Sequence, residues 1–202
     1  MTMIDLDKEN MAQNRDLRIL AISGSARKLS FNTALIEAAK EVAPEDMSIS
    51  RFNVSGFLLF SVDIEFNPTN EIQVFKENIR LADAILFASP EYNYSVTAVM
   101  KNAIEWGNRP ENFWSGKPAA IISATTGPRG GVRSQLHLRQ IMVDLNMHPI
   151  NRPQVLVGNS REKFDSNLNL QDEATRKALR ELLEALKTWT LNLRGRMEST
   201  NS

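Results

Sequence analysis

Short apolar runs alternate with amphipathic stretches along most of the chain. The runs have the length of buried strands, and we predict strands at residues 17–23, 48–54, 84–89, 119–125 and 154–157. Such alternation is typical of βαβ units, whose parallel sheet is covered by helices on both faces. The pattern therefore predicts an α/β fold built on five parallel strands.

Apolar side chains recur at helical spacing between these strands. The first stripe ends before Pro44, and the last begins after Asp172 and Glu173, whose charges suit the positive end of a helix. Two further helices are predicted from about residue 95 to 106 and from about 131 to 147. The remaining three carry the stripes Leu35, Ala38, Ala39 and Val42; Ile72, Phe75, Ile79 and Ala82; and Leu179, Leu182, Leu183, Leu186 and Trp189.

One domain, residues 17–194, accounts for this pattern. The 202-residue chain is 42% hydrophobic and 24% charged, which is ordinary for a globular protein with a sizeable core. Residues 1–16 are polar and lack any period, so we predict a flexible leader there. A short tail is predicted at residues 195–202.

The composition excludes several classes of function. The chain has no Cys, which rules out disulfides and thiolate nucleophiles, and its two histidines, His137 and His148, lack metal-ligand spacing. We therefore expect no metal site. The 24 basic and 24 acidic residues balance without a basic block, and no apolar run has the length of a membrane span. We predict a cytoplasmic protein that binds neither nucleic acid nor a membrane.

Glycines mark the loops that follow two of the strands. Gly24 follows the first strand, and Gly127, Gly130 and Gly131 follow the fourth, while all nine glycines fall outside the proposed helix interiors. In open α/β sheets ligands bind beyond the carboxyl ends of the strands. These loops are therefore the expected binding region.

Residues 23–33, S-G-S-A-R-K-L-S-F-N-T, join the first strand to the first helix. They offer several hydroxyls, an amide, the guanidinium of Arg27 and the free N–H groups of a helix start, which together suit a phosphomonoester. Neither a P-loop nor a dinucleotide fingerprint is present. The alternative is that Ser30 or Asn32 merely caps the helix, but this does not explain Arg27.

Residues 89–95, S-P-E-Y-N-Y-S, follow the third strand. Tyr92 and Tyr94 offer flat surfaces beside a stiff proline turn, so this segment is suited to a planar heteroaromatic ring. Packing of the two tyrosines at the strand end is the alternative. After the fourth strand, residues 125–131 are small enough for backbone to approach a ligand closely. Arg129 in that turn is either a solvated surface residue or a contact for a ribose phosphate.

Three motifs in this order, G-S-x-R-x-x-S-x-N-T, P-E-Y-N-Y-S and T-x-G-x-x-G-G-x-R, resemble those of the NAD(P)H-dependent FMN reductase family. The resemblance is to its branch of bacterial quinone, chromate and azo-dye reductases, and it covers about residues 17–158. It implies a flavodoxin-like three-layer sandwich with strand order 2-1-3-4-5. FMN is then expected at the crossover between the first and third strands.

The resemblance also implies a set of FMN-binding residues. The phosphate is expected at Ser25, Arg27, Ser30, Asn32 and Thr33, with Phe31 in the same motif, and the ring at Pro90, Glu91, Tyr92 and Asn93, with Thr125, Thr126 and Gly127 on its other side. No catalytic residue is assigned, because the flavin itself carries the redox chemistry.

The activity implied is hydride transfer from NADPH or NADH to flavin N5. The electrons then pass to a small acceptor such as a quinone, chromate, an azo dye or free flavin. An electron carrier or FMN-binding regulator with the same fold is the alternative. Carriers of this fold are usually strongly acidic, whereas this chain has a formal net charge of +0.

The chain departs from the family at Thr97-Ala98, where Pro-Gly is common, and at residues 58–63, where an acidic segment is common. A homodimer or homotetramer is expected from the family. Apolar residues in two connections suit such an interface: Phe57, Leu58, Leu59 and Phe60, and Trp106, Phe113 and Trp114. For Arg133, His137 and Arg139 an exposed polar face or an assembly contact is favoured over a catalytic role.

Overall fold

A single parallel sheet forms the centre of the protein. The computed structural model describes residues 16–200, so the predicted leader lies outside the described residues apart from Asp16. The sheet order is β2-β1-β3-β4-β5, with β6 also paired to β4, which confirms the predicted order. Its strands are β1 (Leu17–Ser23), β2 (Met47–Phe52), β3 (Ala84–Ala88), β4 (Pro118–Ala124), β5 (His148–Pro149) and β6 (Val155–Val157).

The fifth strand of the prediction is divided in two. β5 pairs with the start of β4 and β6 with its end, along the same edge. Pro153 lies between the two strands, and proline has no N–H to donate to a ladder. His148 lies in β5, and the predicted strand 154–157 corresponds to β6 alone.

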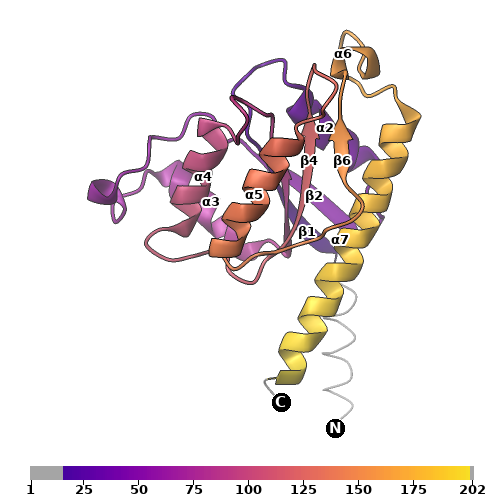
Figure 1. The fold of residues 1–202 in the computed structure, drawn as a ribbon. Helices are drawn as coiled ribbons and strands as arrows, with labels where there is room; N and C mark the ends of the chain where they lie inside the picture. The colour runs from indigo at the N-terminus through magenta and orange to yellow at the C-terminus, as the bar shows by residue number, and fades with distance from the viewer. Residues whose placement is uncertain (1–15, 201–202) are drawn as a thin grey trace.

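Helices cover both faces of the sheet and complete three layers (Figure 1). One buried cluster joins α2 (Phe31–Glu41) and α7 (Glu173–Thr200) to the sheet. The other joins α3 (Asn70–Leu81), α4 (Ala98–Asn108) and α5 (Val132–Asp144). The short η1 (Val62–Ile64) and α6 (Ser160–Lys163) lie in connections.

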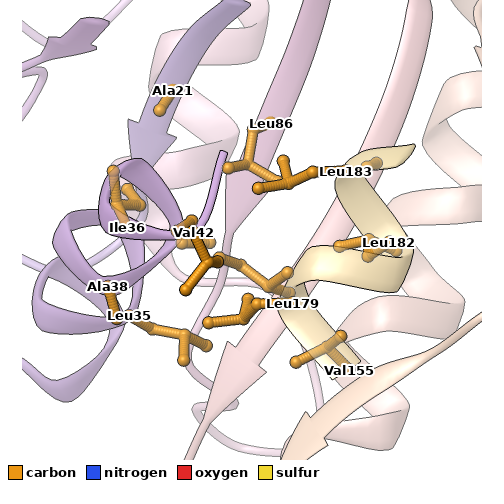
Figure 2. Packing of buried hydrophobic residues seen from close by; sticks show 14 of the residues in the cluster. Ala21, Leu35, Ile36, Ala38, Val42, Leu86, Val155, Leu179, Leu182 and Leu183 are labelled. Carbon is orange, nitrogen blue, oxygen red and sulfur yellow. The ribbon is translucent and has the colours of Figure 1, made fainter. Parts of the chain in front are cut away.

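Residues of the central strands alternate between the two clusters. In β1, Ile19 and Ala21 pack toward α2 and α7, whereas Leu20 and Ile22 pack toward the opposite helices. Figure 2 shows side chains of α2 and α7 converging over the sheet. Both faces of these strands are buried, which explains why their sequences are continuous apolar runs. Each fully buried leucine or isoleucine contributes about 1.5–3 kcal/mol.

α4 begins later than predicted, at Ala98 rather than near residue 95. The chain first makes a tight turn from Tyr92 to Ser95, and Thr97 then caps the helix, its Oγ1 accepting from the N–H of Met100 at 3.1 Å. The helix also continues to include Gly107, contrary to the prediction that glycines avoid helix interiors. A Cβ at Gly107 would lie 2.4 Å from the Trp114 ring, so packing requires glycine there.

α7 extends beyond the predicted domain boundary at residue 194. It continues to Thr200 and contains Gly195, so a helix occupies most of the predicted tail. Among residues 16–200, no helix combines the length and apolar composition needed to cross a membrane.

The apolar residues assigned to an interface separate into two groups. Trp106 and Trp114 are fully buried core residues, so that part of the expectation is wrong. Trp106 donates from Nε1 to the carbonyl of Leu58 at 2.7 Å, which fixes the start of the connection. Leu58 and Leu59 themselves remain exposed, at 55% and 76%.

Candidate functional site

The loops that follow β1, β3 and β4 form one cleft at the carboxyl edge of the sheet. The cleft holds about 450 Å³ of empty space, its open mouth included. It is lined by Ser25, Arg27, Ser30, Phe31, Asn32, Pro90, Glu91, Tyr92, Ala124, Thr125 and Thr126. All the predicted site residues are in this set except Thr33, Asn93 and Gly127, and Ala124 is an addition.

The first of these loops ends at the start of α2. Ser30 caps the helix, its Oγ accepting from the N–H of Thr33 at 3.2 Å. The N–H groups of Phe31 and Asn32 stand in the first turn, where no helical carbonyl reaches them. Both residues line the cleft, so the positive end of α2 faces it. Helix capping and anion binding are thus compatible roles for this loop.

Arg27 is the exposed cation of the same loop. Its backbone N–H donates to Ser25 Oγ at 3.3 Å, which shapes the loop. Its guanidinium makes no hydrogen bond or ion pair with any residue that the structure describes. Arg27 therefore reaches the cleft with all its side-chain donors available.

Asn32 lines the cleft as predicted, but its side chain has a partner that the sequence did not indicate. Its side chain is buried, donates to the carbonyl of Ala124 at 2.8 Å and accepts from the N–H of Ala124 at 3.0 Å. The amide is therefore committed to the end of β4, and only the backbone N–H is left for an anion. Thr33 is similar, because its Oγ1 donates to Ser23 Oγ at 3.0 Å instead of facing the cleft.

Thr97 connects the loop between β1 and α2 to α4. The sequence analysis did not predict this contact. Its hydroxyl donates to the carbonyl of Gly24 at 2.6 Å while capping α4. A Cβ at Gly24 would lie 3.0 Å from both Thr97 Oγ1 and Met100 Cβ, so a larger residue would push these elements apart. A threonine directly before an apolar helix was the available signal.

Residues 89–95, which we call the aromatic loop, close in a two-residue turn. Tyr92 and Ser95 exchange backbone hydrogen bonds of 3.1 and 3.0 Å, with Asn93 and Tyr94 between them. Both central residues have positive φ, 50° and 69°. Tyr92 lines the cleft, whereas Asn93 and Tyr94 form the tip of the turn outside it.

Glu91 and Arg133 form an ion pair beside this turn. Arg133 donates from Nε to Glu91 Oε1 at 2.6 Å and from its backbone N–H to Oε2 at 3.0 Å. Burial opposes ionisation of Glu91, but the hydrogen bonds and charge of Arg133 outweigh it and lower the pKa of the carboxyl. The Arg133 guanidinium also lies over the Tyr94 ring, 3.5 Å from its centroid.

The first two turns of α5 hold the whole aromatic loop. Ser134 donates from Oγ to Ser89 Oγ at 2.8 Å, and His137 Nδ1 lies 3.0 Å from Ser95 Oγ. His137 is exposed, as expected of a polar face, and Arg133 is half-buried, but both side chains also contact the loop that follows β3. Arg139 lies elsewhere and donates to the carbonyl of Ile150 at 2.9 Å.

The turn after β4 is pressed against β6. Gly130 has φ +60°, and a Cβ there would lie 2.6 Å from the carbonyl carbon of Leu156. Thr125 Oγ1 donates to the carbonyl of Gly127 at 3.0 Å, within the same turn. The side chain of Arg129 is exposed and has no hydrogen-bond or ion-pair partner among the described residues.

Residues 17–162 match the family described as NADPH-dependent FMN reductase. The chain belongs to this family. An NAD(P)H-dependent FMN reductase of Pseudomonas aeruginosa is 44% identical over 184 residues, covering 89% of this chain and 98% of the relative. An NADPH:quinone oxidoreductase of Arabidopsis thaliana is 46% identical over 187 residues, covering 89% of this chain and 95% of that relative.

Among solved structures, the fold resembles FerB, a flavoenzyme NAD(P)H:(acceptor) oxidoreductase from Paracoccus denitrificans. The TM-score is 0.80 at 26% sequence identity, covering 87% of this chain and 98% of FerB. The family match and this fold agree with the resemblance inferred from the three motifs.

Proposed function

We propose that the cleft binds FMN and that the protein is an NAD(P)H-dependent oxidoreductase with a small electron acceptor such as a quinone, chromate, an azo dye or free flavin. The convergence of the three motif loops on one cleft carries this proposal, because each loop supplies a different part of the ligand site. The reductase names of the relatives support the same activity.

The residues present fit a phosphorylated ligand with a planar ring. Arg27, the Ser25 and Ser30 hydroxyls and the N–H groups at the start of α2 would hold the phosphate, since unpartnered donors and a helix terminus favour a dianion. The Pro90–Tyr92 segment would hold the ring from one side and Thr125 and Thr126 from the other. Asn93 and Gly127 lie outside the lining and would act only by shaping the turns that carry Tyr92 and Thr125.

FMN, when bound, supplies the ability to accept a hydride from a nicotinamide and to release electrons to an acceptor. The protein's own tasks are then binding and orientation, and no side chain is assigned to proton transfer or nucleophilic attack. Either NADPH or NADH is the co-substrate in this proposal. The second candidate, an electron carrier or FMN-binding regulator, shares the cleft but not the turnover.

Anaerobic reduction of the FMN-loaded protein separates these functions. With an enzyme, the yellow colour of the flavin bleaches on addition of NADPH or NADH and recovers with a quinone. Colour without bleaching would indicate a carrier, and absence of FMN binding would refute both. Stopped-flow reduction with the two nicotinamides and a panel of acceptors then defines the substrates.

We also propose a homodimer or homotetramer in the cytoplasm. Exposed apolar side chains in the connection between β2 and α3 support an assembly, since Leu59 is 76% and Phe66 80% exposed. Sedimentation analysis of the wild type and of Leu59→Asp tests this. An assembly that uses this connection should weaken in the variant, and a wild-type monomer would contradict the proposal.

A further inference from the structure

The tip of the aromatic loop has an unfavourable backbone conformation. Asn93 and Tyr94 are both left-handed, at φ 50° and 69°. Asparagine tolerates this region, but a bulky residue such as tyrosine does so only at a cost. The hydrogen bonds that close the turn offset part of this cost, and Tyr94 also has contacts outside the turn.

Those contacts come from the start of α5. The guanidinium of Arg133 lies 3.5 Å from the centroid of the Tyr94 ring. Arg133 is itself held by Glu91, whose side chain is only 10% exposed and accepts from both the backbone N–H and Nε of Arg133. Because these hydrogen bonds fix the Arg133 guanidinium, its flat face has a defined position against the Tyr94 ring.

Tyr94 has no evident direct role in the cleft. The residue is 66% exposed and is not among those that line the cleft. Its backbone, however, lies between Tyr92 and Ser95, whose mutual hydrogen bonds close the turn. The conformation of Tyr94 therefore determines where Tyr92 lies.

We propose that Arg133 is a positioning residue: by holding the Tyr94 ring, it keeps the Tyr92–Ser95 turn closed and Tyr92 against the cleft. The effect on FMN binding rests on the proposed function, whereas the effect on the turn does not. His137, beside Ser95, supports the same turn from the next turn of α5.

Tyr94→Ala and Tyr94→Gly form a matched pair that tests the proposal. Both remove the ring, but glycine adopts positive φ freely and alanine does not. Tyr94→Ala should weaken FMN binding about tenfold, because the left-handed conformation then lacks its anchor. Tyr94→Gly should stay close to the wild type. Equal weakening in both variants would mean that the ring acts by direct contact, and this would overturn the proposal.

Arg133→Lys tests the other partner while leaving a cation beside Glu91. It should weaken FMN binding in the wild-type background and have little further effect in the Tyr94→Gly background, where no ring remains to hold. An equal effect in both backgrounds would overturn the proposal. Thermal unfolding of each variant verifies that the domain remains folded.

Amide hydrogen exchange in the FMN-free protein gives a readout independent of the cofactor. The N–H groups of Tyr92 and Ser95 should exchange about tenfold faster in Tyr94→Ala, and faster in Arg133→Lys, but not in Tyr94→Gly. Unchanged exchange in Tyr94→Ala and Arg133→Lys would overturn the proposal. The expected exchange pattern in a protein that does not bind FMN would instead refute the proposed function and leave the role of Arg133 intact.

Discussion

Replacing Arg27 with alanine gives the most direct test of the phosphate site. The side chain is exposed and makes no hydrogen bond or ion pair with the described residues, so its removal should leave the fold unchanged. Each charge-assisted hydrogen bond lost with a bound phosphate is worth roughly 1.5–3 kcal/mol. Arg27→Ala should therefore raise the FMN dissociation constant by about one to two powers of ten.

Fluorescence titration with FMN and with riboflavin measures this effect and supplies its control. Riboflavin lacks the phosphate, so its affinity should be the same for Arg27→Ala and the wild type. Lys28→Ala is a matched control, because it also removes an exposed positive charge, from the next position. An unchanged FMN dissociation constant in Arg27→Ala would refute the assignment. An equal loss in Lys28→Ala would show that long-range charge, not a direct contact, attracts the phosphate.

Three further predictions concern stability. Asn32→Ala should lower the free energy of unfolding by about 1–3 kcal/mol in urea titrations, because the buried N–H and carbonyl of Ala124 lose their partners; an unchanged value would contradict this. Gly130→Ala should destabilise by about 1–3 kcal/mol in the same assay, since its positive φ and the backbone of β6 exclude a Cβ, and full stability would show that the turn can move away. The lowered pKa of Glu91 stabilises the fold above the ordinary glutamate pKa of about 4.3, and this contribution is lost as the pH falls through the lower folded value. The free energy of unfolding of Glu91→Gln should therefore vary less with pH in acid than that of the wild type. Identical pH profiles would contradict the role of the ion pair with Arg133.

The hydrophobic pattern along the chain was sufficient to predict the sheet and the helices that cover it. Continuous apolar runs indicated strands buried on both faces, and the observed strands differ from the predicted ones by at most two residues at either end. The exceptions had non-local causes. The split of the fifth strand depends on where Pro153 falls along the edge of β4, and position 107 requires glycine because Trp114 packs against it.

The motifs likewise indicated which loops form the cleft, but not what each side chain does there. Asn32 was expected on the phosphate, yet it pairs with Ala124, 92 residues away. Arg133 was expected on an exposed polar face or in an assembly contact, yet within its own chain it pairs with Glu91, 42 residues away. Neither pairing leaves a trace in periodicity or spacing.

The sequence by itself determined the fold class, the strand order through the family resemblance, and the three loops that meet at the carboxyl edge of the sheet. These follow from hydrophobic period and from residues close together in the chain, which act locally. Only the tertiary structure decided which polar side chains are free to bind a ligand and which hold the loops in place. That distinction depends on the rotation of α2 and α5 about their axes and on their distance from β4, because a hydrogen bond forms only within a few tenths of an ångström of its preferred length.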